Sequence, residues 1–172
     1  MNGTKIRIAG TIKESITDGA GIRYTVFVQG CAFACEGCHN SHAQNFDGGT
    51  LADINEIFAD IIKNPLLSGV TFSGGEPFLQ AEGLSVLAEK IKEAGLELAV
   101  YTGYSYEEII NSSNPHFSKL LSFTDTLIDG RFILSQKSLK LKFKGSGNQR
   151  IINVKESLRQ DRVILDESER WN

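Results

Sequence analysis

Three cysteines lie close together in the sequence, at Cys31, Cys35 and Cys38. They are the only cysteines of the chain, and this odd, tightly spaced set indicates metal or redox chemistry rather than a disulfide framework. A 4Fe–4S cluster has four irons that each need an outer ligand, so three thiolates leave one iron open. An open metal position is what a catalytic site needs to hold a substrate. The spacing therefore predicts a catalytic 4Fe–4S cluster.

A zinc site is the alternative interpretation of the same residues. His39 or His42 lies near enough in the sequence to complete a Cys3His tetrahedron, which would make the chain a zinc-stabilised interaction module. Structural zinc usually stabilises small domains that lack a core, whereas this chain has 172 residues and 41% hydrophobic residues. Composition favours the cluster, and spacing alone leaves the zinc alternative open.

A second polar motif, running from Ser73 to Pro77, follows the short apolar run 69–72. The consecutive glycines Gly74 and Gly75 would let the backbone approach a ligand closely. Glu76 adds a carboxylate that could accept hydrogen bonds from an amino group. A glycine pair is often only a turn, so the motif gains weight from its expected position beside the cysteines.

Strand and helix patterns alternate along the chain. The predicted strands are 22–29, 69–72, 96–101, 126–128 and 149–154, and the predicted helices are 51–62, 79–94, 106–111 and 117–122. This alternation indicates parallel strands joined by right-handed helical crossovers, whose carboxyl-end loops form the ligand site. The cysteines, Gly74, Thr102 and Asp129 should meet there. Because the units are too few for an eight-stranded barrel, we expect an α/β fold with an open partial (β/α) barrel.

Length and composition define the remaining expectations. The chain is expected to be a single domain over 1–172, with the charge-rich residues 157–172 a peripheral tail. A net charge of −3 argues against nucleic acid as a partner, and no apolar run is long enough to cross a membrane, so a cytoplasmic protein is expected. Lys140, Lys142 and Lys144 alternate with apolar residues, which predicts a strand whose lysines protect a sheet edge.

The two motifs together resemble those of the radical SAM superfamily, in which S-adenosylmethionine (SAM) binds the open iron. Further segments resemble the activating enzymes of anaerobic (class III) ribonucleotide reductase over most of the chain, from about 8 to 154. The segments are 18–23, 38–40, 101–104, 127–132 and 145–150. Ala20 stands where that family usually has proline, and Gly37 where the superfamily often has an aromatic residue.

The resemblance implies an activity and its participants. An electron from a flavodoxin- or ferredoxin-like donor would reduce the cluster, SAM would be cleaved to a 5′-deoxyadenosyl radical, and a glycine of the reductase would become the radical. Gly74, Gly75 and Glu76 would hold the methionyl amino group, with Thr102, Asp129 and Asn40 close to the cofactor. Asp18 would help to position the reductase's glycine loop. Another small radical SAM enzyme that modifies a small molecule is the second alternative.

Overall fold

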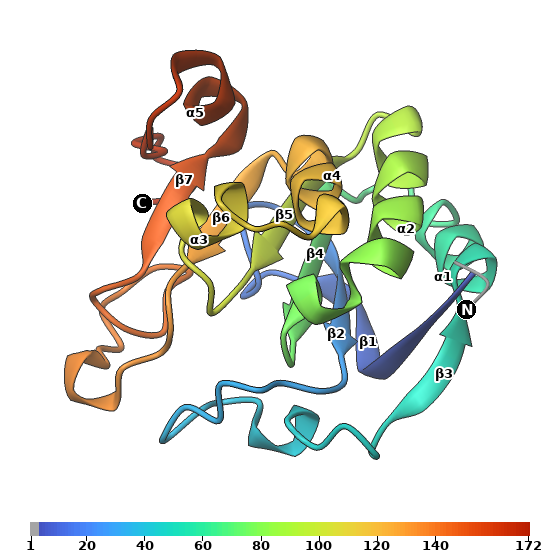
Figure 1. Ribbon diagram of the computed structural model, residues 1–172. Coiled ribbons are helices and arrows are strands. Elements are labelled where there is room, and N and C mark those ends of the chain that lie inside the picture. Colours follow the sequence, from blue (N-terminus) through green and yellow to red (C-terminus); the bar gives the residue numbers. More distant parts are fainter. Residues whose placement is uncertain (1–3) are drawn as a thin grey trace.

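The computed structural model describes residues 4–172 and contains one seven-stranded mixed sheet (Figure 1). The strands are β1 (Lys5–Ser15), β2 (Arg23–Val28), β3 (Thr50–Asp53), β4 (Gly69–Gly74), β5 (Glu97–Tyr101), β6 (Thr126–Asp129) and β7 (Arg150–Asn153). Their order across the sheet is β3-β1-β2-β4-β5-β6-β7. The central strands β2, β4, β5 and β6 are parallel, and β1, β3 and β7 pair antiparallel at the two sides.

Five α-helices connect or follow these strands in the described part of the chain. They are α1 (Ile54–Ile61), α2 (Ala81–Glu93), α3 (Tyr106–Ile110), α4 (Pro115–Phe123) and α5 (Val154–Gln160), with short 3-10 turns η1 (Ser41–Ala43), η2 (Pro77–Gln80) and η3 (Leu134–Gln136). Local caps fix several of the helix starts. Ser105 and Glu108 form a capping box at α3, and Asn114 with Pro115 begins α4.

The two faces of the sheet have different coverings. Alternate strand residues such as Val26, Phe72 and Val100 pack under α1, α2 and α4 in the main hydrophobic core. The opposite face is more polar, and includes the buried residues Arg23 and Thr71. A smaller cluster covers part of that face, and its members are Ala20, Ala99, Ile128, Ile151 and Trp171. One face therefore supplies stability, and the other is available for a ligand.

The structure confirms the α/β architecture and corrects it in detail. The parallel centre was predicted, but the sheet also has antiparallel margins, and its outermost strands, β3 and β7, are not paired with each other among residues 4–172. The sequence did not predict β1. Most of its residues are partly or fully exposed, so apolar and polar residues alternate only weakly along it. Residues 50–53 form β3 instead of a first helical turn, because the Asp53 side chain accepts a hydrogen bond from the Asn55 N–H and starts α1 at Ile54.

The structure of the last forty residues differs in detail from two expectations. Lys140, Lys142 and Lys144 lie in turns and irregular chain between η3 and β7, so they form no basic strand. The residues after 157 are more than a peripheral tail, since α5 includes Ser157 and the side chain of Trp171 is only 2% exposed. No helix in residues 4–172 is long and apolar enough to span a membrane.

Candidate active site

The loops that follow the parallel strands surround one cavity of about 590 Å³. The loop after β2 and the loop between β6 and β7 both extend from the lower end of the sheet in Figure 1. Nine of the ten residues predicted for the site line this cavity: Asp18, Cys31, Cys35, Cys38, Asn40, Gly74, Gly75, Glu76 and Thr102. For the residues that follow β2, β4 and β5, the convergence follows from topology, because parallel neighbours end at the same edge of the sheet. Asp18 reaches the cavity from the turn before β2.

The cysteine loop is held in place mainly through its backbone. The Gly30 N–H donates to the Ala43 carbonyl at 2.7 Å, and the Cys31 N–H donates to the Gln44 carbonyl at 3.1 Å, which closes the loop at both ends. Between them, Ala34 and Gly37 adopt left-handed conformations with φ of 48° and 73°. These turns fold the segment between Cys31 and Cys38 back on itself, as three ligands on one cluster require.

All three thiols are free and partly buried. Burial raises the pKa of the Cys31 thiol, and the nearby Glu76 carboxyl adds to that effect. The thiol is thus favoured until a metal binds the thiolate. Within residues 4–172, no three His, Cys, Asp or Glu side chains are already gathered as a metal site. The donor chemistry nonetheless fits an iron–sulfur cluster, because one loop brings three soft ligands to one cavity.

Neither histidine completes a zinc tetrahedron in this arrangement. His39 lines the cavity, but its ring packs edge-on against Phe132 at 5.6 Å between ring centroids. His42 is not among the lining residues. No ligand group of either kind is already gathered among residues 4–172, so the fit to an iron–sulfur cluster rests on the three soft thiols that line one cavity.

Glu76 is the most deeply buried carboxyl of the cavity, at 1% exposure. Its Oε1 accepts from the Thr102 hydroxyl at 2.8 Å and the Phe78 N–H at 3.0 Å, and its Oε2 accepts from the Gly103 N–H at 2.7 Å. Burial outweighs these three donors and raises the pKa of Glu76 to about 7. A carboxylate offers about four acceptor positions, so one position on Oε2 remains for a further donor.

The glycine pair is required by the protein's own backbone. A Cβ at Gly74 would lie 2.5 Å from the Val28 nitrogen, and φ at this residue is +93°. A Cβ at Gly75 would overlap the Gly30 carbonyl, immediately before Cys31. The end of β4 thus packs directly on the start of the cysteine loop. This close approach is internal, whereas the sequence suggested an approach to a ligand.

Asp18 lies in the turn between β1 and β2, defined here as the Asp18 turn, 18–21. Its Oδ2 accepts from the Ser15 hydroxyl at 2.5 Å and the Thr25 hydroxyl at 3.3 Å. Its carbonyl accepts from the Thr71 hydroxyl at 2.8 Å. The carboxylate lines the cavity and is held by short side chains of the polar sheet face.

Two residues predicted to lie near the cofactor, Asp129 and Asn40, make hydrogen bonds within the protein. Asp129 does not line the cavity: it accepts from Arg150 Nη2 at 2.5 Å and from the Tyr106 N–H at 2.8 Å, which ties β6 to β7 and to the start of α3. The expectation that it faces SAM therefore loses its geometric basis. Asn40 lines the cavity, and its carbonyl accepts from the Ala43 N–H at 2.8 Å in the η1 turn.

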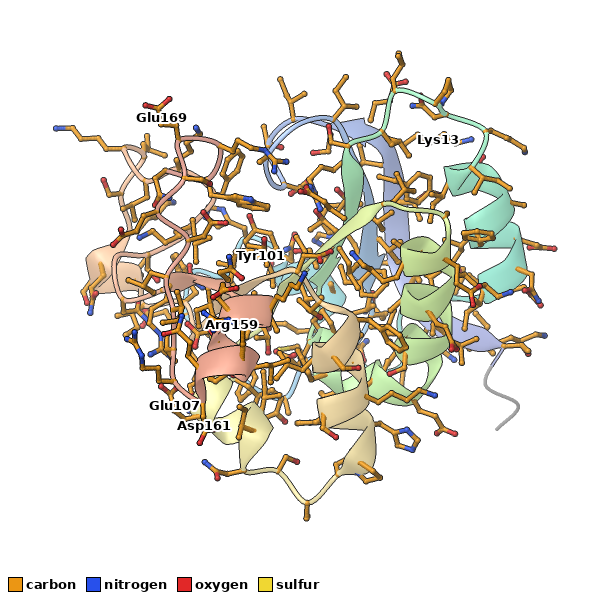
Figure 2. The ribbon with its side chains drawn as sticks, turned by 90° about the horizontal axis from the view of Figure 1, so that it is seen from above. Lys13, Tyr101, Glu107, Arg159, Asp161 and Glu169 are labelled. Atoms are coloured by element: carbon orange, nitrogen blue, oxygen red, sulfur yellow. The ribbon has the colours of Figure 1, made fainter. Side chains whose placement is uncertain are left out.

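Two residues outside the predicted site set also shape the site. Tyr101 ends β5 near the middle of the molecule (Figure 2), lines the cavity and donates its hydroxyl to the Phe143 carbonyl at 2.9 Å. Arg23 is fully buried beneath the Asp18 turn and donates to the Ala20 carbonyl at 3.0 Å. An arginine inside an otherwise apolar strand was the available signal, because such a charge needs internal partners.

Comparisons with known proteins show which families the chain resembles. The family described as "4Fe-4S single cluster domain" matches residues 17–152. The anaerobic ribonucleoside-triphosphate reductase-activating protein of Haemophilus influenzae is 34% identical over 151 residues, covering 81% of this chain and 93% of that protein. Its counterpart in Vibrio cholerae is 32% identical, covering 78% and 89%. The pyruvate formate-lyase-activating enzyme of Clostridium pasteurianum is 38% identical over 117 residues, covering 63% of this chain and 49% of that enzyme.

Proposed function

The chain belongs to the family of anaerobic ribonucleoside-triphosphate reductase-activating proteins, and on that premise we propose that it generates a glycyl radical on a partner reductase. The protein uses a 4Fe–4S cluster and SAM. When bound, the reduced cluster supplies the electron that cleaves SAM into methionine and a 5′-deoxyadenosyl radical. The observation that carries the proposal is the meeting of three free thiols and the Gly74–Glu76 segment in one cavity.

The residues of the cavity divide into ligands and positioning groups. Cys31, Cys35 and Cys38 would hold three irons and leave the fourth for SAM. Glu76 would accept a hydrogen bond from the SAM ammonium through the free position on Oε2, while Thr102 fixes the carboxylate through Oε1. A bound ammonium would also favour the ionised carboxylate, because an opposite charge lowers a carboxyl pKa.

The cavity walls would orient the substrate and exclude water. Gly74, Gly75, Asn40 and Asp18 all line the cavity. The first three would lie on the side of the cofactor, and Asp18 would belong to the wall formed by the turn before β2. Asp18 would accept hydrogen bonds from the target peptide and hold the glycine close to the radical. Such positioning is a major part of catalysis when the chemistry belongs to a cofactor.

Several finer features belong to the same proposal. The sheet would act as an open partial barrel of the radical SAM type, forming one domain over 1–172. The electron donor would be a flavodoxin- or ferredoxin-like protein, and the reaction would take place in the cytoplasm. The roles of the individual site residues are part of this proposal.

One experiment tests the function directly. The protein is purified without oxygen, reconstituted with iron and sulfide, and mixed with SAM, a strong chemical reductant and an anaerobic ribonucleotide reductase. Electron paramagnetic resonance should then detect a glycine-centred radical on the reductase that requires SAM. SAM cleavage without that radical would instead favour a radical SAM enzyme with a small-molecule substrate. A preparation that binds zinc and no iron would contradict both.

A further inference from the structure

Trp171 is the single tryptophan of the chain and lies on the polar face of the sheet, away from the main core. It is 2% exposed and packs with Ala20, Ala99, Ile128 and Ile151. It does not line the cavity. Its importance comes from what it contacts, because it lies between two segments that do line the cavity.

The first of these segments is the Asp18 turn. The Arg23 guanidinium, which donates to the Ala20 carbonyl, lies 5.5 Å from the centre of the Trp171 ring. A Cβ on Gly19 would come within 2.9 Å of the ring carbon Cη2 of Trp171, so the turn rests directly against the indole. The conformation of Gly19, with φ of +139°, suits glycine. The indole and Arg23 thus support the turn that presents Asp18.

The second segment, residues 143–145, is called here the Phe143 loop. The Phe143 ring packs edge-on against Trp171 at 5.4 Å between centroids. Phe143 has a left-handed backbone with φ of 58°, a conformation that non-glycine residues adopt only when their surroundings impose it. Its carbonyl accepts from the Tyr101 hydroxyl at 2.9 Å. The indole and Tyr101 therefore determine where this second wall stands.

The C-terminal segment that carries Trp171, residues 166–172, is fastened to the rest of the molecule on several sides. Arg170 makes two hydrogen bonds of 2.9 Å to the Glu97 carboxylate, which also pairs with Arg23 at 3.4 Å. Lys142 donates to the Glu169 carbonyl at 3.0 Å. Figure 2 shows Glu169 at the edge of the molecule, while Tyr101 lies near its middle. The segment links the Phe143 loop to β5.

We propose that Trp171 is a positioning residue that holds the Asp18 turn and the Phe143 loop at the separation needed to admit the target peptide. The indole packs against both walls and does not itself line the cavity. Its removal should loosen these two walls and leave the cysteine loop in place. The role in peptide transfer rests on the proposed function, whereas the coupling of the two walls can be measured without it.

Hydrogen exchange of the protein without cluster or SAM tests the coupling of the walls. In Trp171→Ala, the hydrogen-bonded amides at the two walls should exchange at least tenfold faster, while those of β4 and β5 keep their protection. These amides are Thr17, which donates to Ser15 Oγ beside the Asp18 turn, and Gly145, which donates to Gln149 Oε1 in the Phe143 loop. Leu120→Ala is the matched control, since Leu120 is a fully buried residue of α4 that belongs to the main core. It should not accelerate exchange selectively in the two walls. Unchanged exchange in both walls of Trp171→Ala would overturn the proposal.

A split between two activities tests the consequence for the reaction. Reconstituted Trp171→Ala should keep its iron content, its SAM affinity and the slow SAM cleavage seen without a partner, yet generate the glycyl radical at least tenfold more slowly. Trp171→Phe should recover most of that loss, because an aromatic ring can still pack against Phe143 and Arg23. Equal losses in cleavage and radical transfer would refute the positioning role.

A milder variant covers the case in which Trp171→Ala does not fold. Arg170→Gln weakens the attachment to Glu97 without removing the buried ring. Because Trp171 is the only tryptophan, its fluorescence reports the position of the segment directly. Acrylamide should quench Arg170→Gln more strongly than the wild type, with faster exchange in the two walls. Increased quenching without faster exchange there would show that the indole does not hold them. If the wild type makes no glycyl radical, the function fails while the exchange result still stands.

Discussion

The Glu76 carboxylate and the Thr102 hydroxyl lie 2.8 Å apart and join the ends of two neighbouring parallel strands, β4 and β5. The Thr102 Oγ1 also accepts from the Tyr104 N–H at 3.1 Å. The threonine therefore also links Glu76 to the segment that leads into α3. A buried carboxyl held in this way can serve both as a structural link and as an acceptor for a ligand. The pH dependence of the free energy of unfolding, measured without a ligand, reports the structural contribution of this carboxyl alone.

The raised pKa of Glu76 predicts that protein without cluster or SAM loses stability as pH rises. The pKa in the folded state is about 7, against an ordinary value of 4.5. The folded state therefore holds the proton more tightly, and the stabilisation is complete below 4.5 and lost as pH passes through about 7. The free energy of unfolding, measured in urea, should fall by about 3 kcal/mol across this range relative to Glu76→Gln. A relative gain with rising pH would mean that the three donors keep the carboxylate ionised.

Replacing any one cysteine should abolish the cluster. Cys31→Ser, Cys35→Ser and Cys38→Ser each exchange a soft thiolate for a hard oxygen that binds iron–sulfur clusters poorly. Iron and acid-labile sulfide should fall close to zero, and SAM cleavage should disappear. His39→Ala and His42→Ala are the controls and should keep the cluster. A serine variant with full iron, sulfide and cleavage would contradict the ligand assignment.

Gly75→Ala should reduce cluster content and SAM affinity together. Its Cβ would overlap the Gly30 carbonyl, so the end of β4 would push against the start of the cysteine loop. Gly10→Ala is a suitable control, because a Cβ there meets nothing within 4 Å. Iron content and SAM binding are measured on the same sample. Loss of SAM binding with full iron content would show that Gly75 acts mainly through the ligand.

Asp18→Asn should uncouple radical transfer from SAM cleavage. The amide keeps the size of the side chain, and loss of a peptide contact worth about 1.4 kcal/mol already slows the coupled step tenfold. Cluster content and cleavage without a partner should be retained. Asp47→Asn, on an exposed residue, is the control. Equal changes in both activities, or none, would leave Asp18 as a residue of the turn alone.

Arg150→Leu should destabilise the fold through Asp129. Asp129 is 1% exposed and, without Arg150, would keep only the Tyr106 N–H as a donor. Loss of one partner of a buried pair costs about 3 to 5 kcal/mol, measured as the change in the free energy of unfolding. Glu107→Gln, which removes the exposed partner of Arg150, should cost only about 0 to 1 kcal/mol. Similar small losses in both variants would argue against a structural ion pair at Asp129.

The sequence predicted what depends on short-range patterns. The parallel strands, the main helices and the loops that carry Cys31 and Glu76 follow from apolar periodicity and from the common edge of parallel strands. Contacts between distant segments could not be predicted in this way. The Asp129–Arg150 pair and the packing of Trp171 join residues that share no local pattern. The prediction of a basic strand at Lys140–Lys144 was wrong, because alternation of lysine with apolar residues does not make a strand when no partner strand pairs with it.

The two outer strands, β3 and β7, each pair on one side only, and this openness bears on what kind of substrate can reach the cavity. A glycine inside a folded protein arrives with polypeptide on both sides, so a hairpin-shaped segment needs a way in and a way out. A closed ring of strands would force both arms through one opening, whereas β3 and β7 are not paired with each other among residues 4–172 and the strands form no such ring. The target segment can then be laid in from the side, with no free chain end. An incomplete sheet thus suits modification of a macromolecule better than capture of a metabolite.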